Sequence, residues 1–458
     1  MLRYIGPFLR MNKLSLEQVE SQLFHLSKES IKQLVFNSKC GIILDPKESN
    51  LKNIPNIDIS TINLNSPLLC IYKKANPKLK SKNNKLYWDE DDFKKDINIS
   101  SNGYMTLALL ELADYYKKFK DIDKKKYALS NAYVELAKKQ LEFYASNLRN
   151  LEGVFVDKKD CTDPLIGKLK IKDKNKGFKF WEQALLMNAF YKCSTYLEGE
   201  AKESYKNFSL DILNMFLEFK DEIYDISFED RCNLCLNLNI FYTYSKIEDV
   251  KPLILDVFDL LYEEYSNSLS DDKIQYLCLM YLNSAFLFKH TNMFKFKRIS
   301  NKINDILKNH YDKDLCMFIK ATESKEIKFS CDEIVLYLIS MIYQYHLEDD
   351  VDEKIITDVF KSQLIDSGIV LSWPDIPTLD DVEHYKDFSS KPENLLDDQY
   401  FKLPTIPTPE MSEFAPIFIK YVVYNKEKHT FKARKSSFDS RKNLNLFFLI
   451  LYTLSKTP

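Results

Sequence analysis

The sequence predicts an all-α protein of about twelve helices, and three observations lead to this fold class. Only 8 glycines and 15 prolines occur among the 458 residues, which leaves few of the turn residues that an all-β or α/β chain needs. Hydrophobic residues make up 45% of the chain, enough to bury a large core. After Ser100, apolar residues recur at spacings of three and four, which is the period of a helix with a buried face.

Residues 1–100 are predicted to form an irregular N-terminal arm with one or two short helices. Ser15 and Gln18 have the spacing of a capping box, in which each side chain binds the backbone N–H of the other residue, so a helix is expected to begin there. A second short helix is expected to start at residue 27 and to stop before Gly41. From 42 to 100, four prolines interrupt every pattern, and 68–72 is the one predicted strand.

Residues 101–458 are predicted to hold the helices as six antiparallel hairpins. The predicted helices lie near 102–119, 124–149, 179–198, 201–220, 228–245, 250–266, 271–289, 293–309, 331–347, 353–366, 412–425 and 440–455. Each has an apolar face that it must pack against a neighbour. Because no sequence repeat of fixed period is evident, a closed ring is favoured over a solenoid, and the first and last helices are expected to lie side by side.

The lengths of the connections predict which end of the ring carries a functional site. If successive helices alternate in direction, every connection that follows an even-numbered helix emerges at the same end. The three long connections, 150–178, 310–330 and 367–411, follow helices two, eight and ten. They are therefore expected together at one end, and long loops on a rigid body are where binding and catalytic residues are usually found.

This organisation resembles the six-hairpin (α/α)6 toroids, an architecture found in many glycoside hydrolases, polysaccharide lyases, sugar epimerases, lanthionine cyclases and prenyl-group cyclases. Residues 153–157 (Gly-Val-Phe-Val-Asp) and 177–184 (Gly-Phe-Lys-Phe-Trp-Glu-Gln-Ala) look like the funnel loop and inner helix of sugar-acting members. The resemblance covers residues 101–458 and implies a toroid that follows the arm. Sugar epimerases of this architecture use a histidine pair as acid and base, and only His310 and His384 are expected at the long-loop end.

The first long connection carries residues that suit a sugar site. Asp157 and Asp160 lie within it, and Trp181 and Glu182 begin the helix that follows. An aromatic ring can stack on the apolar face of a sugar, while carboxylic acids transfer protons to and from the glycosidic oxygen. The alternative interpretation is a hydrated loop whose acids interact favourably with the N-terminus of the helix.

The third long connection contributes further aromatic and acidic residues in a proline-rich stretch, whose backbone is restrained. On the hydrolase hypothesis, Glu182 is one catalytic carboxylate, and Asp375 or Asp398 is its counterpart. The candidate substrate-binding residues are Asp157, Asp160, Trp181, Trp373 and Tyr400. The alternative interpretation of this connection is a surface flap that covers the end of the ring.

The remaining motifs point to packing or to solvent contact. Cys232 and Cys235 form a C-x-x-C pair in an apolar helix without the second pair that a zinc site needs, so buried, unliganded thiols are expected. The acidic run 349–353 resembles a Mg²⁺-diphosphate motif, but it is expected at the short-loop end as a solvated helix cap. The sequence has no glycine-rich phosphate loop and no G-x-S-x-G motif. No metal and no cofactor is therefore predicted.

Charge and hydropathy narrow the range of partners. The net charge is −2, from 65 basic and 67 acidic residues, so a nucleic acid is not expected to bind. No run of about 18 apolar residues is present, which argues against a membrane span. Nine scattered cysteines are typical of reduced thiols in the cytoplasm. Two functions stay open: a carbohydrate-active enzyme, or a non-catalytic toroid that binds a carbohydrate or protein partner through its long-loop end.

Overall fold

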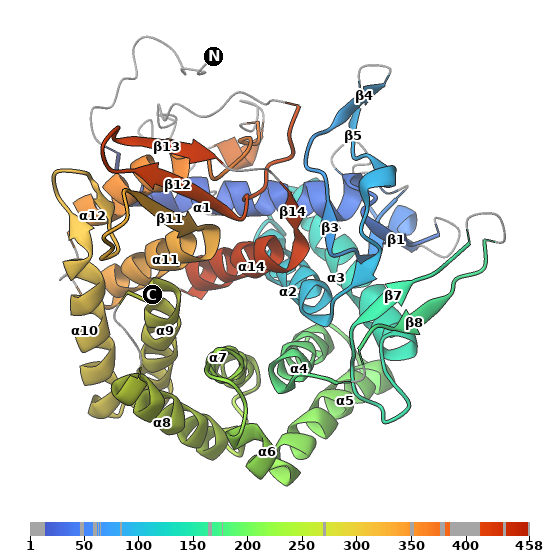
Figure 1. Cartoon of the computed structure of the whole chain (residues 1–458). Helices are drawn as coiled ribbons and strands as arrows, with labels where there is room; N and C mark the ends of the chain where they lie inside the picture. Colours follow the sequence, from blue (N-terminus) through green and yellow to red (C-terminus); the bar gives the residue numbers. More distant parts are fainter. Residues whose placement is uncertain are drawn as a thin grey trace.

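The protein folds as an (α/α)6 toroid, in which a ring of inner helices is surrounded by outer helices (Figure 1). The computed structural model describes residues 14–45, 50–57, 62, 64, 66–82, 85–163, 167–175, 177–268, 272–348, 352–375, 381–384, 413–433 and 437–456. Within these residues, the inner ring comprises α2 (Ile99–Lys117), α4 (Phe180–Ser194), α7 (Phe228–Ser245), α9 (Ile274–Thr291), α11 (Cys331–Leu347) and α14 (Ser440–Lys456). Each packs on the next in this order, and α14 packs on α2.

Each inner helix is covered by an outer helix. The described outer helices are α3 (Lys124–Asn147), α5 (Gly199–Glu218), α8 (Val250–Ser268), α10 (Phe294–Asn309), α12 (Glu353–Val359), which the π-helix η4 (Phe360–Ile365) continues, and α1 (Leu16–Lys32). They pack on α2, α4, α7, α9, α11 and α14, respectively, and the short α6 (Lys220–Tyr224) follows α5. The inner helices are buried on almost every side, because both rings and their neighbours surround them.

The seam between α14 and α2 closes the ring along its whole length. Near the start of both helices, the hydroxyls of Ser101 and Ser440 form a hydrogen bond of 2.9 Å. Further along, the rings of Tyr104 and Phe448 lie 5.7 Å apart. At the far ends, the hydroxyl of Ser455 in α14 donates to the carboxylate of Glu111 in α2. The two helices are thus parallel neighbours, and the predicted contact between the first and last helices of the ring is confirmed.

The sequence prediction was right for the helices from 102–119 to 353–366 and for 440–455, but it was wrong for 412–425. The described part of that range ends in a strand, β12 (Tyr421–Asn425), which pairs with β11 (Glu326–Ser330) and β13 (Thr430–Ala433). Aromatic and β-branched side chains at 421–424 favour a strand. A left-handed residue in the turn, His429, completes the hairpin with β13.

The sixth outer helix comes from the other end of the chain. The helix that begins after the Ser15–Gln18 capping box is α1, which packs on α14 and continues into the π-helix η1 (Gln33–Asn37). The predicted strand at 68–72 is also present as β2 (Leu68–Ile71), paired with β1 (Gly41–Ile43). The division of the chain at residue 100 stays a prediction, although α1, on the N-terminal side of it, packs within the outer ring.

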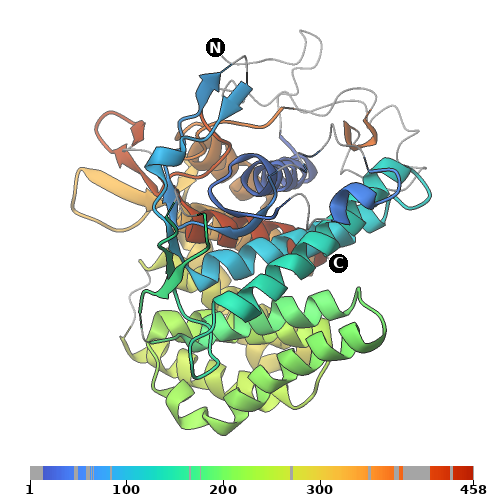
Figure 2. The same cartoon turned by 90° about the vertical axis from the view of Figure 1, so that its right-hand side faces the viewer.

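The short strands gather at the end of the ring where the inner helices begin, on the left-hand side of Figure 2. Strands β6 (Asp96–Ile97), β11 and β14 (Phe438–Asp439) lead almost directly into α2, α11 and α14. They pair with strands of the long connections and of the N-terminal region, namely β7 (Lys158–Asp160) with β6, β12 with β11, and β3 (Lys74–Ala75) with β14. The described strands of the first two long connections therefore share one end, as predicted. The third connection was predicted at the same end, but its segment η5 (Val382–His384) lies at the opposite end, where Glu383 contacts Tyr115 near the end of α2 and Lys126 near the start of α3.

Smaller elements complete the described structure. Strand β8 (Ile171–Asp173) extends the sheet of β7, β9 (Tyr311–Asp312) pairs with β10 (Met317–Phe318), and β4 (Lys80–Lys82) pairs with β5 (Lys85–Tyr87). Among the described residues, single-turn 3-10 helices occur at η2 (Asn50–Asn53), η3 (Glu90–Asp92) and η5 (Val382–His384).

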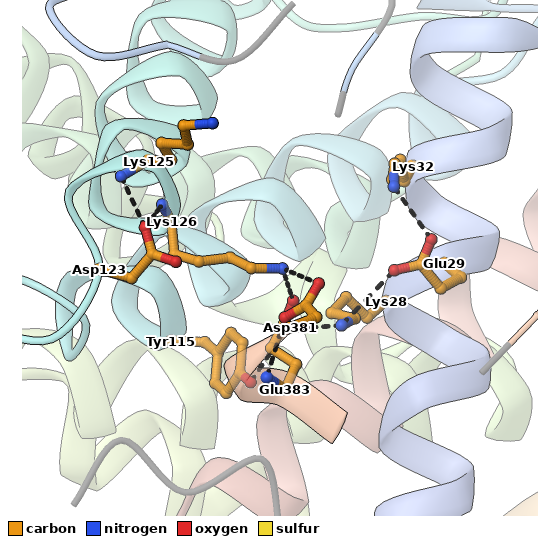
Figure 3. Close-up of polar contacts among 9 residues, drawn as sticks. All are labelled: Lys28, Glu29, Lys32, Tyr115, Asp123, Lys125, Lys126, Asp381 and Glu383. Atoms are coloured by element: carbon orange, nitrogen blue, oxygen red, sulfur yellow. Dashed lines mark hydrogen bonds and ion pairs between the residues drawn. The ribbon is translucent and has the colours of Figure 1, made fainter. Parts of the chain in front are cut away.

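A buried network of charges fastens η5 to the helices (Figure 3). The carboxylate of Glu383 accepts a hydrogen bond of 2.6 Å from Lys28 in α1 and one of 3.0 Å from the hydroxyl of Tyr115 in α2. It also pairs with Lys126 in α3, which bonds Asp381 at 2.8 Å. Although burial acts to raise it, the two ammonium groups lower the pKa of Glu383 to about 2. The network thus joins three helices and one connection through a single carboxylate.

The C-x-x-C pair lies in the core, as predicted. Cys232 and Cys235 are both fully buried in α7 and carry free thiols. Burial raises the pKa of both thiols, because a thiolate is poorly solvated inside the protein. These two residues therefore act as small apolar side chains in the packing of the inner ring.

The close approach of α2 and α4 depends on Gly103. A Cβ atom at this position would lie 2.7 Å from the side chain of Leu185. We expect Gly103→Val to lower the free energy of unfolding by about 2–3 kcal/mol, because the buried neighbours cannot move aside. Gly177→Val is the control, since a Cβ at Gly177 meets nothing within 4 Å. Chemical denaturation that finds equal losses in the two variants would refute this role of Gly103.

Replacing the carboxylate of Glu383, at the centre of the buried network, should lower the free energy of unfolding at neutral pH. Because the folded-state pKa of Glu383 is lowered, its contribution is present above the ordinary carboxyl pKa of about 4.3 and is lost as the pH falls towards 2. We expect Glu383→Gln to lower the free energy of unfolding at pH 7 by about 3 kcal/mol. The matched control is Glu413→Gln, whose ion pair with Lys78 is exposed on both sides and should contribute below about 1 kcal/mol. A small and equal effect of the two changes, measured by denaturation at pH 7, would contradict this account.

Candidate functional site

Four inner helices bring their first turns together around Trp181, at the end of the ring that carries the first two long connections (Figure 1). Trp181 lies in the first turn of α4, and its indole Nε1 donates a hydrogen bond of 2.8 Å to Asp230 in α7. The guanidinium of Arg441, in α14, lies 5.1 Å from the centre of the Trp181 rings. Tyr104 of α2 packs on Trp181 with ring centroids 6.4 Å apart. Trp181 is therefore the residue at which α2, α4, α7 and α14 meet, and it is 1% exposed.

Glu182, the next residue of α4, is a buried acid in this cluster. Its burial, followed by the negative charge of Asp157, raises the pKa of the Glu182 carboxyl to about 7. The hydroxyl of Ser100 and the positive charges of Arg441 and Lys179 act in the opposite direction and do not overcome the rise. A carboxyl group with a pKa near neutrality can both donate and accept a proton under physiological conditions, which is what general acid–base chemistry requires.

Asp157 supplies a second carboxylate from the long connection that precedes α4. Its Oδ1 atom accepts a hydrogen bond of 3.0 Å from the backbone N–H of Ile99, the first residue of α2. There the negative charge interacts favourably with the positive end of the helix dipole. The site thus holds two carboxyl groups in different environments, one buried and the other bound to a helix N-terminus.

Ion pairs between the inner helices surround Trp181. Arg441 of α14 pairs with Glu229 of α7 at 3.2 Å, and Lys179, just before α4, pairs with Asp230 at 2.9 Å. Together with the position of Arg441 over the indole, these pairs occupy the groups that Trp181 would offer to a ligand. A ring ligand that stacks on Trp181 would have to displace the guanidinium.

Asp160 has structural partners. Its carboxylate binds the hydroxyl of Tyr72 and accepts the backbone N–H of Thr162 at 2.8 Å. These bonds join the first long connection to the N-terminal region. The described contacts of Asp160 do not include Glu182 or Trp181, so its predicted role in binding substrate stays a prediction.

The candidates of the third long connection lie against α1. The indole Nε1 of Trp373 donates to the side chain of Gln22 at 3.1 Å, and the backbone carbonyl of Asp375 bonds the ring of His25 at 2.9 Å. These are contacts with an outer helix, and no contact described in the structure joins Trp373 or Asp375 to Glu182. The other two candidates, Asp398 and Tyr400, lie outside the described residues.

The histidine side chains that the structure describes contact residues outside the cluster around Trp181. His25 contacts Asp375, and His290 contacts Asn239 at the opposite end of α7. The partners of His310, His346 and His429 are Ile319, Glu20 and Tyr424, respectively. Within the described part of the chain, the acids beside Trp181 are therefore carboxyl groups without an accompanying histidine.

The described residues contain no group of three or more histidine, cysteine, aspartate or glutamate residues that could hold a metal ion. None of their helices has the length and apolar character needed to cross a bilayer.

Sequence reasoning missed several residues of the cluster. Tyr104, Asp230 and Arg441 come from three helices that are far from α4 in the sequence, and none of them lies in a distinctive motif. One signal was available: each lies within the first turns of a helix that the loop pattern places in the inner ring. Residues at those positions converge in any toroid, because all the inner helices begin at the same end.

Solved structures share this fold. A D-mannose isomerase matches with a TM-score of 0.53 and 7% identity, over 99% of this chain and 100% of that chain. A sugar epimerase from a ruminal bacterium matches with a TM-score of 0.52 and 11% identity, over 85% of this chain and 92% of that chain. A cellobiose 2-epimerase from Bacillus thermoamylovorans B4167 matches with a TM-score of 0.50 and 10% identity, over 94% of this chain and 98% of that chain. At these identities the likeness is one of fold. No protein-family model matches the sequence, and no curated protein matches it.

The raised pKa of Glu182 predicts a stability gain on its neutralisation. The wild-type carboxyl does not lower stability below an ordinary carboxyl pKa of about 4.3. Its destabilising effect grows between that pH and the folded-state pKa of about 7, and it is constant at higher pH. We expect Glu182→Gln to be more stable than the wild type by about 3 kcal/mol at pH 8 and equal to it at pH 4.5. Chemical denaturation at both values measures the difference. A variant that is less stable than the wild type at pH 8 would show that the fold lowers the pKa of Glu182 and would contradict this account.

Proposed function

We propose that this protein is a carbohydrate-active enzyme that hydrolyses a glycosidic bond with two carboxyl groups, at the end of the toroid where the inner helices begin. The observation that carries the proposal is the buried acid Glu182, with a pKa near 7, beside Asp157 and Trp181 at the end with the first two long connections. The shared fold with a D-mannose isomerase and two sugar epimerases supports a carbohydrate ligand.

The two carboxyl groups suit the two roles of this chemistry. Protonated Glu182 donates its proton to the glycosidic oxygen while the bond to the sugar carbon breaks and positive charge develops on the sugar ring. Asp157 acts from the ionised state, either as a base that takes a proton from the attacking water or as the nucleophile. In both cases the water delivers its hydroxyl to the sugar carbon, and one proton returns to the carboxyl pair.

The choice of Asp157 as the counterpart rests on its electrostatic contact with Glu182. Asp375 and Asp398 are the counterparts predicted from the sequence, and they stay candidates, as do Trp373 and Tyr400 for binding substrate. Asp375 is the weaker choice, because its described contact is with α1. Hydrolysis is preferred to epimerisation by a histidine pair, because the described histidine side chains bind elsewhere.

One observation favours a second candidate function, a non-catalytic toroid that binds a carbohydrate or protein partner at the same end. Trp181 is 1% exposed, its N–H is bound to Asp230, and Arg441 covers its ring. A partner that binds over these ion pairs would not need access to Glu182. The two candidates differ in one measurable respect, since only the enzyme turns its ligand over.

We expect Glu182→Gln to lower turnover at least about a hundredfold, because glutamine cannot donate the proton. The assay offers glucose- and mannose-containing disaccharides and oligosaccharides to both proteins. Since the protonated form of Glu182 is the active one, wild-type turnover should fall as the pH rises through about 7, and this limb should be absent from the residual activity of the variant.

Two variants separate the candidate counterparts. Asp157→Asn should also abolish most turnover, whereas Asp375→Asn is expected to leave it unchanged. Glycans bound by the wild type and by Glu182→Gln without any turnover would favour the binding protein. The hydrolase proposal is wrong if turnover is found and Glu182→Gln retains it in full.

A further inference from the structure

One face of Trp181 is covered by a side chain that itself reaches the solvent. Trp181 is 1% exposed, and the guanidinium of Arg441 lies 5.1 Å from the centre of the indole rings. The side chain of Arg441 is 38% exposed. Because solvent lies directly beyond Arg441, a movement of this one side chain would open a face of Trp181 without any need for an internal cavity.

The contacts that hold Arg441 in this position are few. Within the described residues its guanidinium, which has five N–H donors, makes one hydrogen bond, of 3.2 Å to Glu229. The side chain of Glu229 is 45% exposed, so water and salt screen the ion pair. Arg231 provides the contrast of a structural arginine, since its side chain is 9% exposed and its guanidinium binds Glu264 and two backbone carbonyls. Arg441 is held loosely by comparison.

Trp181, in contrast, is fixed in place. Its indole N–H donates to Asp230, and the ring of Tyr104 packs on it. It lies in the first turn of an inner helix that is buried on almost every side, so a movement of the indole would disturb the core. Of the two stacked groups, the one that can turn aside is therefore the guanidinium of Arg441.

The uncovered face of the indole would suit a sugar. The face of an aromatic ring carries negative charge density, which attracts a guanidinium and also attracts the C–H groups on the apolar face of a sugar. The displaced guanidinium of Arg441 can donate to the oxygens of sugar hydroxyl groups, and the carboxylate of Glu229 can accept their protons. A purely apolar ligand would leave both charged groups without a partner. The three side chains thus match a ring with C–H groups on its face and hydroxyl groups at its edge.

The same position would bring the sugar to the acid of the proposed site. Glu182 follows Trp181 directly in α4. Burial and the charge of Asp157 raise the pKa of Glu182, and the charge of Arg441 acts against them, which places the guanidinium near this carboxyl group. A sugar that replaces the guanidinium on the indole would therefore lie beside Glu182.

We propose that Arg441 is a substrate-binding residue that covers Trp181 in the free protein, turns aside when a sugar stacks on the indole, and then donates hydrogen bonds to the hydroxyl groups of that sugar. The inference rests on the proposed function and adds the residue that admits and holds the ligand. It also explains why the tryptophan of the proposed site is buried in the free protein.

The test replaces Arg441 by alanine and by lysine. Lys295→Ala in the outer helix α10 is the matched control, because Lys295 also lies over an aromatic ring, that of Phe296 at 4.7 Å, and also forms an exposed ion pair, with Asp259. Both alanine variants should melt close to the wild-type temperature, since exposed ion pairs contribute little. The melting curves thus separate a loss of binding from a loss of fold.

Quenching of tryptophan fluorescence by acrylamide measures the cover in the absence of any ligand. The three tryptophans of the chain, Trp88, Trp181 and Trp373, are 1%, 1% and 3% exposed, so the wild type should be quenched poorly. In Arg441→Ala the emission of one tryptophan of the three should become quenchable, and the added change Trp181→Phe should abolish this gain. Lys295→Ala should behave like the wild type.

Binding is measured by calorimetry with the glycan panel used for the proposed function, in the Glu182→Gln background, which suppresses turnover. Arg441→Ala should weaken affinity about tenfold, because the hydrogen bonds to the sugar are lost. Arg441→Lys, which keeps the charge and has three donors, should lose only about threefold. In proteins that retain Glu182, Arg441→Ala should raise KM more than it lowers kcat, because Arg441 holds the ligand and transfers no proton.

The other outcomes contradict the inference in distinguishable ways. Increased quenching with unchanged affinity in Arg441→Ala would show that Arg441 only covers the indole and would overturn its role in binding. Unchanged quenching and affinity would make Arg441 a structural residue and leave the proposed function intact. An equal loss of affinity in Lys295→Ala would also overturn a role specific to Arg441. A wild type that neither binds nor turns over any glycan of the panel would overturn the proposed function, and the binding role of Arg441 with it.

Discussion

Closure of the inner ring is the constraint on which the rest of the structure depends. The inner helices carry apolar residues around almost their whole circumference, so each one needs neighbours on every side. The parallel seam between α14 and α2 supplies the last of these contacts. Closure also forces every inner helix to begin at one end, where the dipoles of several N-termini and the side chains of the first turns converge. The candidate site at Trp181 and Glu182 is a direct product of that convergence.

Packing of the two rings buries polar groups, and the protein compensates two buried carboxyl groups to different degrees. At Glu383, two lysines and a tyrosine compensate the buried carboxylate fully, which gives a strong structural contact between α1, α2, α3 and η5. At Glu182 the compensation is incomplete, since burial and Asp157 outweigh the nearby positive charges. An uncompensated acid weakens the fold, and proteins keep such groups mainly where chemistry requires them. This contrast is the physical reason for assigning structure to the first cluster and function to the second.

The sequence predicted the ring because helical periodicity is a local signal, and the eleventh predicted helix, 412–425, was misassigned for the same reason. The apolar run that includes Val422 and Val423 has no period of its own to separate helix from strand, and its strand partners lie elsewhere in the chain. The true outer helix, α1, packs on α14 across more than four hundred residues, a contact that no local pattern can reveal. Glu182 could be predicted as a candidate because acids and a tryptophan accompany a long loop, whereas Arg441 joins the cluster around Trp181 only through ring closure.

The central claim is that ring closure holds Glu182 in the protonated form close to neutral pH. The most direct measurement is a carbon NMR titration of protein labelled at the glutamate carboxyl groups, with Glu182→Gln used to assign the signal. The account predicts one glutamate that titrates near pH 7 and is missing from the spectrum of the variant. A set of spectra in which every glutamate, including the one lost in the variant, titrates below about pH 5 would contradict the account.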